Sequence, residues 1–196
     1  PELRERIEDV VLNRPTPDGR SATERLLEVA EAHNRGGEEA EALRRAGVQV
    51  TVVPGISSAM AGPAAAGIPV TMRGHASGFT VVTGHEDPIA GRHLDWDALA
   101  RLGTTLIVLM GASRTAAIAE RLLAGGMAPD TPVAAIESAT TAAQRTLRTT
   151  LAELDGQVVN APAVLVIGTV ASLDVTDEAG LERLAADAAL TEPSPH

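Results

Sequence analysis

The sequence predicts an α/β fold in which helices pack on a mostly parallel or mixed sheet, and three observations support this prediction. Short apolar runs of strand length alternate with segments of helical spacing from about residue 48 to residue 170. Apolar residues make up 44% of the chain and aromatic residues only 1%, so Ala, Val, Leu and Ile must build the core, which suits helices on a parallel sheet. With 196 residues, the chain is long enough for one large domain or two small α/β lobes.

The first 47 residues have the least regular pattern. We expect a short strand over 7–12 and a turn over 13–20, where two prolines and a glycine gather. A helix is expected from the capping box Ser21-Ala-Thr-Glu24 to about residue 34. A second helix follows over 38–46 with no strand before it, and Gly47 ends it.

The rest of the chain alternates regularly between strands and helices. We expect helices over 57–66, 95–102 (capped by Asp95) and 113–125. The expected strands span residues 48–53, 79–83, 104–110, 133–136 and 164–170. The stretch 144–154 is ambiguous, because it is rich in Thr at first and helical in pattern by Leu151. A helix over 181–190 and a Pro-rich end complete the prediction.

Composition and charge exclude several classes of function. The net charge of −10 argues against a nucleic-acid-binding surface. Cysteine is absent, which excludes disulfides, a thiolate nucleophile and Cys-ligated zinc. All 16 basic residues are Arg, so no lysine can form a Schiff base or bind phosphate, and an anionic substrate must be bound by Arg. No apolar run reaches the length of a membrane span and no signal peptide opens the sequence, so we expect a soluble, cytoplasmic protein.

Small residues follow three of the expected strands, at Pro54–Ala59, Leu109–Gly111 and Glu137–Thr141. In open α/β sheets, ligands bind in the crevice beyond the carboxyl ends of the strands, and small residues expose the backbone there. Ser57 and Ser58 also begin a helix, where unpaired N–H groups favour an anion. Taken singly, each segment is more often an ordinary turn between a strand and a helix.

Taken together, the order and spacing of these segments resemble one family. The chain looks like the uroporphyrinogen-III C-methyltransferases of the tetrapyrrole methylase superfamily over about residues 35–172. The matching segments are RGGEEAEAL at 35–43, VTVVPGISSA at 50–59, AGIPVTMRG at 66–74, FTVVTGH at 79–85, LDWDALA at 94–100, LIVLMG at 106–111, PVAAIESATTAAQRTLRTTLAEL at 132–154 and APAVLVIGTV at 161–170.

The resemblance implies two α/β lobes with S-adenosylmethionine in the cleft between them. Residues 1–53 would be the remainder of an N-terminal lobe on the substrate side, 54–172 the C-terminal lobe on the cofactor side, and 173–196 a C-terminal helix and tail. It also implies a homodimer that methylates a small tetrapyrrole, uroporphyrinogen III, at C2 and C7. The product is precorrin-2, which feeds sirohaem and cobalamin biosynthesis, and S-adenosylhomocysteine is released.

This chemistry needs no metal, because the methyl group of the sulfonium is already activated. The protein must align the methyl group with the pyrrole carbon, supply a weak base for a ring proton, and bind the substrate's carboxylates. Guanidinium groups bind carboxylates bidentately, which fits the Arg-only basic residues.

The resemblance also implies site residues. Arg35 and Arg73 resemble the substrate-binding arginines, and Glu38 resembles the carboxylate that removes the proton. Met110 resembles a methionine at the cofactor and substrate. Ser57, Ser58 and Ala139 resemble backbone contacts to the cofactor, and Pro162 and Ala163 resemble residues that close over the adenine.

Each of these positions also has a structural interpretation. Glu38 suits the first turn of a helix, where the macrodipole favours a carboxylate. The arginines suit surface salt bridges, and Met110 suits a core position on a strand, which we weigh equally with cofactor contact. His75 and His85 are expected to be structural and hydrogen-bonded, and no metal site is predicted.

The sequence departs from the family pattern in two places. Met72 stands between Thr71 and Arg73 where the family usually has His. The two glycine turns for the cofactor that the family carries before its Arg-Gly-Gly-Glu-Glu segment are absent, so the N-terminal lobe is expected to be incomplete. We expect interruptions at the Asn34–Arg35 junction and within 13–20, which a Cα–Cα separation well above ~3.8 Å would reveal.

Three alternative functions stay open. One is a later precorrin methyltransferase of the corrinoid pathway on the same fold. Another is a non-catalytic module that binds S-adenosylmethionine or a tetrapyrrole, which the shortened N-terminal lobe favours. A general phosphate- or nucleotide-binding protein ranks third, because the sequence has neither lysine nor a GxGxxG or Walker loop.

Overall fold

The computed structural model describes residues 36–45, 50–85 and 94–176. The chain divides into two compact units, residues 1–55 and 56–196. The elements expected over 7–12, 21–34 and 181–190 lie outside the described residues, and so does the Asn34–Arg35 junction. The assignment of a substrate-side and a cofactor-side lobe stays a prediction.

The first unit contains helix α3, Gly36–Arg45, which confirms the helix expected over 38–46. Ala40 and Leu43 are buried on one side of this helix, and Arg45 pairs with Glu41 one turn earlier on its exposed side. A predicted strand over 48–53 is wrong for its described part. Residues 50–53 form no ladder with any described strand, and without a hydrogen-bonded neighbour the apolar pattern alone does not make a strand.

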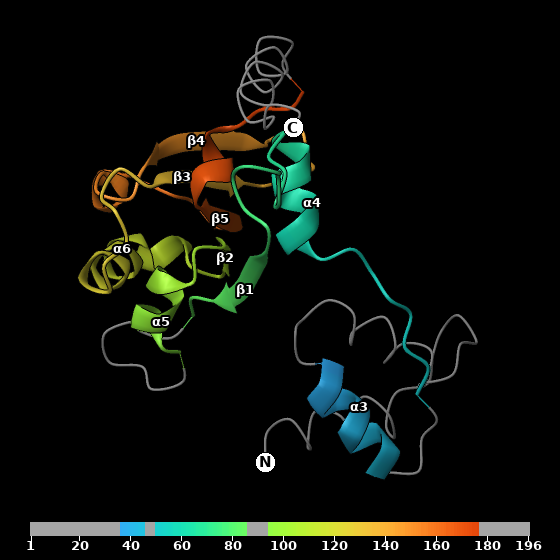
Figure 1. The fold of residues 1–196 in the computed structure, drawn as a ribbon. Coiled ribbons are helices and arrows are strands. Elements are labelled where there is room, and N and C mark those ends of the chain that lie inside the picture. The colour runs from blue at the N-terminus through green and yellow to red at the C-terminus, as the bar shows by residue number, and fades with distance from the viewer. Residues whose placement is uncertain (1–35, 46–49, 86–93, 177–196) are drawn as a thin grey trace, which may run out of the picture. The chain divides into compact units, whose positions relative to one another are not determined.

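The second unit is built on a five-stranded mixed sheet with the order β1-β2-β5-β3-β4 (Figure 1). Its strands are β1 Phe79–Thr83, β2 Thr105–Leu109, β3 Pro132–Glu137, β4 Arg145–Thr150 and β5 Ala163–Ile167. Strands β1 and β2 are parallel, whereas β5 runs antiparallel to both β2 and β3, and β4 is antiparallel to β3. The expectation of a mixed α/β sheet is confirmed.

Strand β4 resolves the ambiguous stretch 144–154. Its Thr-rich half forms a hairpin partner for β3, since β-branched side chains pack well on a pleated surface. The helix suggested from Leu151 is reduced to the 3₁₀ turn Leu154–Gly156. The strand expected over 164–170 ends at Ile167, because Gly168 takes a φ of 135° and turns the chain into the 3₁₀ helix Thr169–Ser172.

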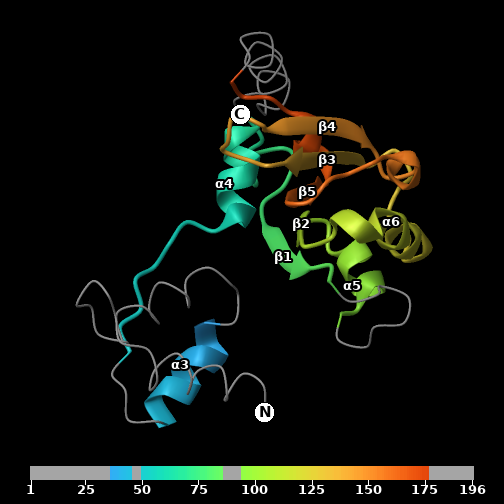
Figure 2. The ribbon, with the colours of Figure 1, turned by 180° about the vertical axis from the view of Figure 1, so that it is seen from behind.

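Three helices, all expected from the sequence, cover the sheet. Helix α4 spans Ser58–Ala65, α5 spans Trp96–Arg101, and α6 spans Thr115–Ala124 after the 3₁₀ turn Ala112–Arg114. Asp95 caps α5 as predicted, accepting a hydrogen bond from the Ala98 N–H at 2.9 Å. Helix α4 lies on one face of the sheet and α5 and α6 lie on the other, as Figure 1 and Figure 2 show from opposite sides.

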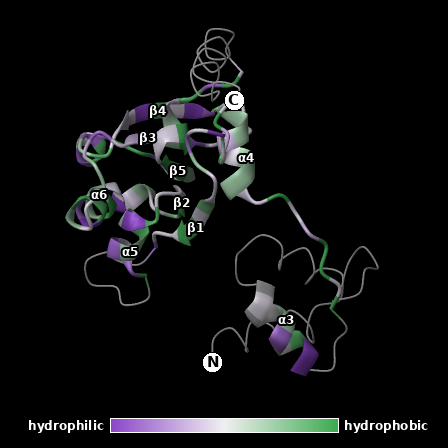
Figure 3. Ribbon diagram, viewed as in Figure 1, coloured by the Kyte–Doolittle hydropathy of each residue, from purple (hydrophilic) through white to green (hydrophobic). Residues whose placement is uncertain are grey.

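Two apolar cores follow from this layering. Successive side chains of β2 point to opposite faces, so Leu106 and Val108 pack with α6 while Ile107 packs with α4. In Figure 3, β5 is green and the outer strand β4 carries purple, polar residues. The central strands are therefore apolar on both faces, which explains their near-continuous apolar sequences.

Candidate functional site

Four chain segments meet at one edge of the sheet. The registers pair Thr83 with Leu109, Leu109 with Val164, and Glu137 with Ala163. The carboxyl ends of β1, β2 and β3 therefore lie at the same edge as the start of β5. We call this the carboxyl edge, comprising residues 83–85, 109–111, 137–141 and 161–163.

The backbone at the carboxyl edge is strained. Met110, Ser138 and Thr140 have φ values of 57°, 46° and 66°, and they are the non-glycine residues with positive φ in the described part of the chain. Each such residue costs about 1–3 kcal/mol, and such residues cluster at binding and active sites. All three lie within three residues of the end of β2 or β3, at the place where the sequence predicts a ligand.

The turn at Met110 decides between the two interpretations of its side chain. Strand β2 ends at Leu109, and the side chain of Met110 is 53% exposed beyond it. The interpretation of Met110 as a core residue of the strand is therefore wrong. An exposed methionine at the carboxyl edge is available to a ligand, and its contact with the cofactor stays a prediction.

Two glycines let the turns after β1 and β2 approach each other closely. A Cβ at Gly84 would lie 2.9 Å from Val108 Cγ1 and 3.0 Å from the Cα of Gly111. The N–H of Gly84 also donates to the carbonyl of Leu109 at 2.7 Å. These contacts explain why a glycine stands just after each strand, Gly84 after β1 and Gly111 after β2.

Helix α4 packs against the same edge. Gly62 lies inside this helix, and a Cβ on it would lie 3.3 Å from Val164 Cγ2 and 3.7 Å from Ala139 Cβ. Ser57, which is exposed, caps the helix start by accepting from the Ala59 N–H at 3.3 Å. Ser58, also exposed, is the first residue of the helix.

A buried carboxylate connects the segments at this edge, and sequence reasoning did not assign it a role. Glu137 is 7% exposed and accepts a hydrogen bond from the backbone N–H of Asn160 at 2.8 Å. Its other oxygen lies 3.5 Å from Nε of Arg145. Beside it, the N–H of Ser138 donates to the carbonyl of Pro162 at 2.9 Å. The sequence feature that could have identified Glu137 is its charge at the end of the apolar strand Pro132–Glu137.

The structure thus brings most of the predicted cofactor residues together. Met110, Ala139, Pro162 and Ala163 lie at the carboxyl edge, and α4, which Ser57 and Ser58 begin, packs against it. The bond between Ala161 and Pro162 is cis. Exposed turns, small side chains and backbone groups beyond the carboxyl ends of strands fit a cofactor with adenine, ribose and amino-acid parts, such as S-adenosylmethionine.

Arg73 lies at the opposite edge of the sheet. Its loop lines an open hollow of about 610 Å³, formed by residues 71–77 and Gly103. The carbonyl of Gly78 accepts from the Thr105 N–H at 3.1 Å, which places this loop at the amino ends of β1 and β2. A five-residue strand separates the edges by roughly 13 Å. Within the second unit, therefore, Arg73 does not lie beside the residues that are predicted to bind the cofactor.

The other residues predicted for the reaction belong to the first unit. Glu38 is part of α3, and Arg35 lies outside the described residues. Their roles stay predictions. His85, in the second unit, forms a hydrogen bond between Nδ1 and Thr83 Oγ1 at 3.1 Å, as expected for a hydrogen-bonded histidine.

The described ranges hold no group of three or more His, Asp or Glu residues arranged to bind a metal ion. Among the helices described, none is long and apolar enough to cross a membrane.

Comparisons with known proteins agree on one family. The family model of the tetrapyrrole (corrin/porphyrin) methylases matches residues 32–155. The chain is 49% identical over 144 residues to an S-adenosyl-L-methionine-dependent uroporphyrinogen III methyltransferase of Methanosarcina barkeri, covering 71% of this chain and 56% of the relative. It is 50% identical over 143 residues to a uroporphyrinogen-III C-methyltransferase of Pseudomonas aeruginosa, covering 69% and 56%.

The fold is also that of a solved relative. The crystal structure of uroporphyrin-III C-methyl transferase from Thermus thermophilus, complexed with S-adenyl homocysteine, matches with a TM-score of 0.65 and 35% identity, covering 84% of this chain and 76% of that one. The aligned part of the chain spans about half the length, 56%, of the two curated relatives.

Proposed function

The chain belongs to the tetrapyrrole (corrin/porphyrin) methylases, and we propose that it methylates uroporphyrinogen III at C2 and C7 to give precorrin-2, with S-adenosylmethionine as methyl donor. Two relatives that are about half identical to the chain are named uroporphyrinogen III methyltransferases. The observation that carries the proposal is the carboxyl edge, where three strained non-glycine residues and the start of β5 meet against helix α4. The reaction serves sirohaem and cobalamin biosynthesis.

The carboxyl edge would bind the cofactor. S-adenosylmethionine supplies an activated methyl group on a sulfonium. We assign Met110, Ala139, Ser57 and Ser58 to cofactor contacts, and Pro162 with Ala163 to the residues that cover the adenine. Preorganised turns support this assignment, because a backbone already in its bound conformation loses less entropy when the ligand binds.

Arg35, Arg73 and Glu38 would act on the substrate. The carboxylate side chains of uroporphyrinogen suit the bidentate geometry of guanidinium groups. Arg73 is exposed, so its guanidinium is accessible to such a carboxylate. Glu38 is the residue we propose to accept the ring proton, which requires only a weak base beside the carbon that is methylated.

We further propose that the protein acts as a cytoplasmic homodimer. The outer strand β1 supports an interface between copies, since Phe79 and Val81 are 41% and 42% exposed on one face of it. Light scattering coupled to size-exclusion chromatography would give the molecular mass of the assembly. A monomer at micromolar concentration would overturn this part of the proposal.

The proposed reaction is tested by anaerobic incubation of the protein with S-adenosylmethionine and uroporphyrinogen III. We expect the product mass to increase by two methyl groups and the absorption spectrum to become that of precorrin-2. Glu38→Gln should abolish turnover, whereas Glu41→Gln, an exposed residue of the same helix, should leave it unchanged.

Two outcomes would redirect the proposal. Binding of S-adenosylhomocysteine without methylation of any tetrapyrrole would favour the non-catalytic binding module. Methylation of a precorrin but not of uroporphyrinogen III would favour a later corrinoid-pathway enzyme.

A further inference from the structure

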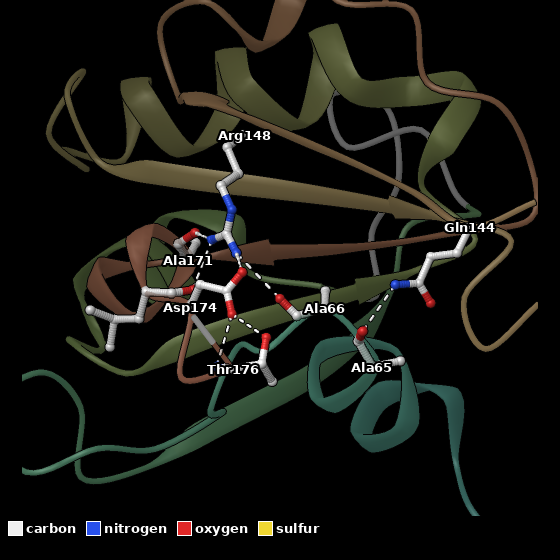
Figure 4. Close-up of polar contacts among 8 residues, drawn as sticks. Ala65, Ala66, Gln144, Arg148, Ala171, Asp174 and Thr176 are labelled. Atoms are coloured by element: carbon white, nitrogen blue, oxygen red, sulfur yellow. Dashed lines mark hydrogen bonds and ion pairs between the residues drawn. The ribbon is translucent and has the colours of Figure 1, made fainter. Parts of the chain in front are cut away.

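The side chain of Gln144 joins two segments that border the carboxyl edge. Its Oε1 accepts a hydrogen bond from the backbone N–H of Thr140 at 2.7 Å. Its Nε2 donates to the carbonyl of Ala65, at the end of α4, at 3.0 Å (Figure 4). Acceptor and donor of one amide are therefore both used, and they connect residues 75 positions apart in the sequence.

Each of these bonds satisfies a backbone group that secondary structure leaves without a partner. Thr140 has a φ of 66°, so it lies in a turn where no strand neighbour can accept its N–H. Ala65 is the last residue of α4, and the final four carbonyls of a helix have no partner inside the helix. Gln144 thus stabilises a strained turn and a helix end with one side chain.

Other hydrogen bonds of the turn from Ser138 to Gln144 join its own residues, and the N–H of Ser138 connects its start to the carbonyl of Pro162 at 2.9 Å. Thr141 Oγ1 donates to the carbonyl of Ser138 at 2.7 Å, and the Ala143 N–H donates to Thr141 Oγ1 at 3.2 Å. These bonds fix the shape of the turn but not its distance from α4. The bridge through Gln144 sets that distance, together with the packing of Ala139 on the apolar cluster that includes Ala59 of α4.

Arg148 offers a contrast on the next strand, β4. It donates to the carbonyls of Ala66 at 3.2 Å, Ala171 at 2.5 Å and Leu173 at 2.9 Å, as Figure 4 shows in part. The bond to Ala66 also anchors the end of α4, and none of the three reaches the turn. General anchoring of α4 can thus be separated from positioning of the turn.

We propose that Gln144 is a positioning residue for the S-adenosylmethionine site, holding the turn around Ala139 at a fixed distance from helix α4. This inference rests on the proposed function, because it assumes that the cofactor binds at the carboxyl edge. Its physical content is that Gln144 acts on cofactor affinity through Thr140 and α4 without touching the cofactor.

Two variants of Gln144 separate the two halves of its amide. Gln144→Met keeps the length of the side chain and removes both hydrogen bonds. Gln144→Glu keeps the acceptor for the Thr140 N–H, loses the donor to Ala65, and places a carboxylate at the negative end of α4. Thr149→Ala is the control, since Thr149 lies on β4, which begins directly after Gln144, and the variant removes an exposed hydrogen bond to Glu153.

The full-length chain is used for three measurements: amide hydrogen exchange at Thr140, the affinity for S-adenosylhomocysteine by calorimetry, and the KM values for both substrates. Gln144→Met should accelerate amide exchange at Thr140 and lower the affinity for S-adenosylhomocysteine about five- to tenfold. It should raise the KM for S-adenosylmethionine and leave the KM for uroporphyrinogen III unchanged. Gln144→Glu should keep the slow amide exchange at Thr140 but still lower the affinity for S-adenosylhomocysteine. Thr149→Ala should change none of these.

The outcomes distinguish failure of this inference from failure of the proposed function. If the wild type binds S-adenosylhomocysteine and Gln144→Met binds it equally well, the inference is overturned and the function stands. If the wild type binds none, the proposed function fails and the inference fails with it. Unchanged exchange at Thr140 in Gln144→Met overturns the inference in either case. If Gln144→Met does not fold, Gln144→Glu becomes the deciding variant. An affinity of Gln144→Glu for S-adenosylhomocysteine equal to that of the wild type would overturn the inference.

Discussion

The buried carboxylate of Glu137 accepts a hydrogen bond from the backbone N–H of Asn160 at 2.8 Å, joining the end of β3 to the segment that enters β5. Both residues lie directly beside the strained turns of the carboxyl edge. The same carboxylate lies 3.5 Å from Arg145 Nε at the start of β4. One acidic side chain thus fixes three neighbouring segments, which makes it the first target for testing how the edge is held.

Glu137→Ala should lower the free energy of unfolding by about 2 kcal/mol, because it removes the charged acceptor of the hydrogen bond from the Asn160 N–H. Glu137→Gln should cost less, since the amide oxygen still accepts that bond. Urea denaturation measures both changes, with Glu153→Ala as the exposed control. Equal costs for Ala and Gln would show that the hydrogen bond to Asn160 contributes nothing.

Gly84→Ala should destabilise the second unit by about 1–3 kcal/mol, because the new methyl group would overlap Val108 Cγ1 and the backbone of Gly111. Gly156→Ala is a matched control, since a Cβ there meets no atom within 4 Å. Thermal unfolding of the two variants gives the comparison. A Gly84→Ala protein as stable as the wild type would mean that the two turns are not in close contact.

Met110→Ala should change stability by less than about 0.5 kcal/mol, because the side chain is exposed. A methionine buried on a strand would instead cost about 2–5 kcal/mol on truncation. The same variant should bind S-adenosylhomocysteine more weakly, which calorimetry detects. Weakened binding at unchanged stability would support cofactor contact, and unchanged binding would remove Met110 from the site.

Arg148→Met should lower the free energy of unfolding by about 2 kcal/mol, since it removes charged donors from three backbone carbonyls. Arg101→Met, at an exposed position on α5, serves as the control. Chemical denaturation measures the stability, and the affinity for S-adenosylhomocysteine should stay at the wild-type value. A variant as stable as wild type would show that solvent replaces Arg148 at these carbonyls.

Elements with strong local patterns were predictable from the sequence. The strand Phe79–Thr83 was predicted with its observed bounds, and the cap of α5 was predicted at Asp95. The segment 50–53 was predicted wrongly, because an apolar run does not reveal whether a neighbouring strand is present. The sequence is ambiguous over strand β4, since its Thr residues and the later Leu and Ala residues favour different structures.

The location of the candidate site was predictable to the level of strand ends, but its internal geometry was not. Positive φ at Ser138 and Thr140 is unusual for these residue types and has no local sequence marker. The contacts of Gln144 with Ala65 and of Glu137 with Asn160 join residues far apart in the chain, which only the fold brings together. The amino-edge position of Arg73 likewise follows from the direction of β1, not from its motif.

The central position of β5 has a consequence for the order in which this unit assembles. The strand lies between β2 and β3, yet it is the last of the five to leave the ribosome. Until residues 163–167 are made, β1-β2 and β3-β4 are separate two-stranded pieces, each with an open inner edge. Completing the sheet therefore waits for contacts between residues far apart in sequence, which slows folding and lengthens the time during which the nascent chain can aggregate.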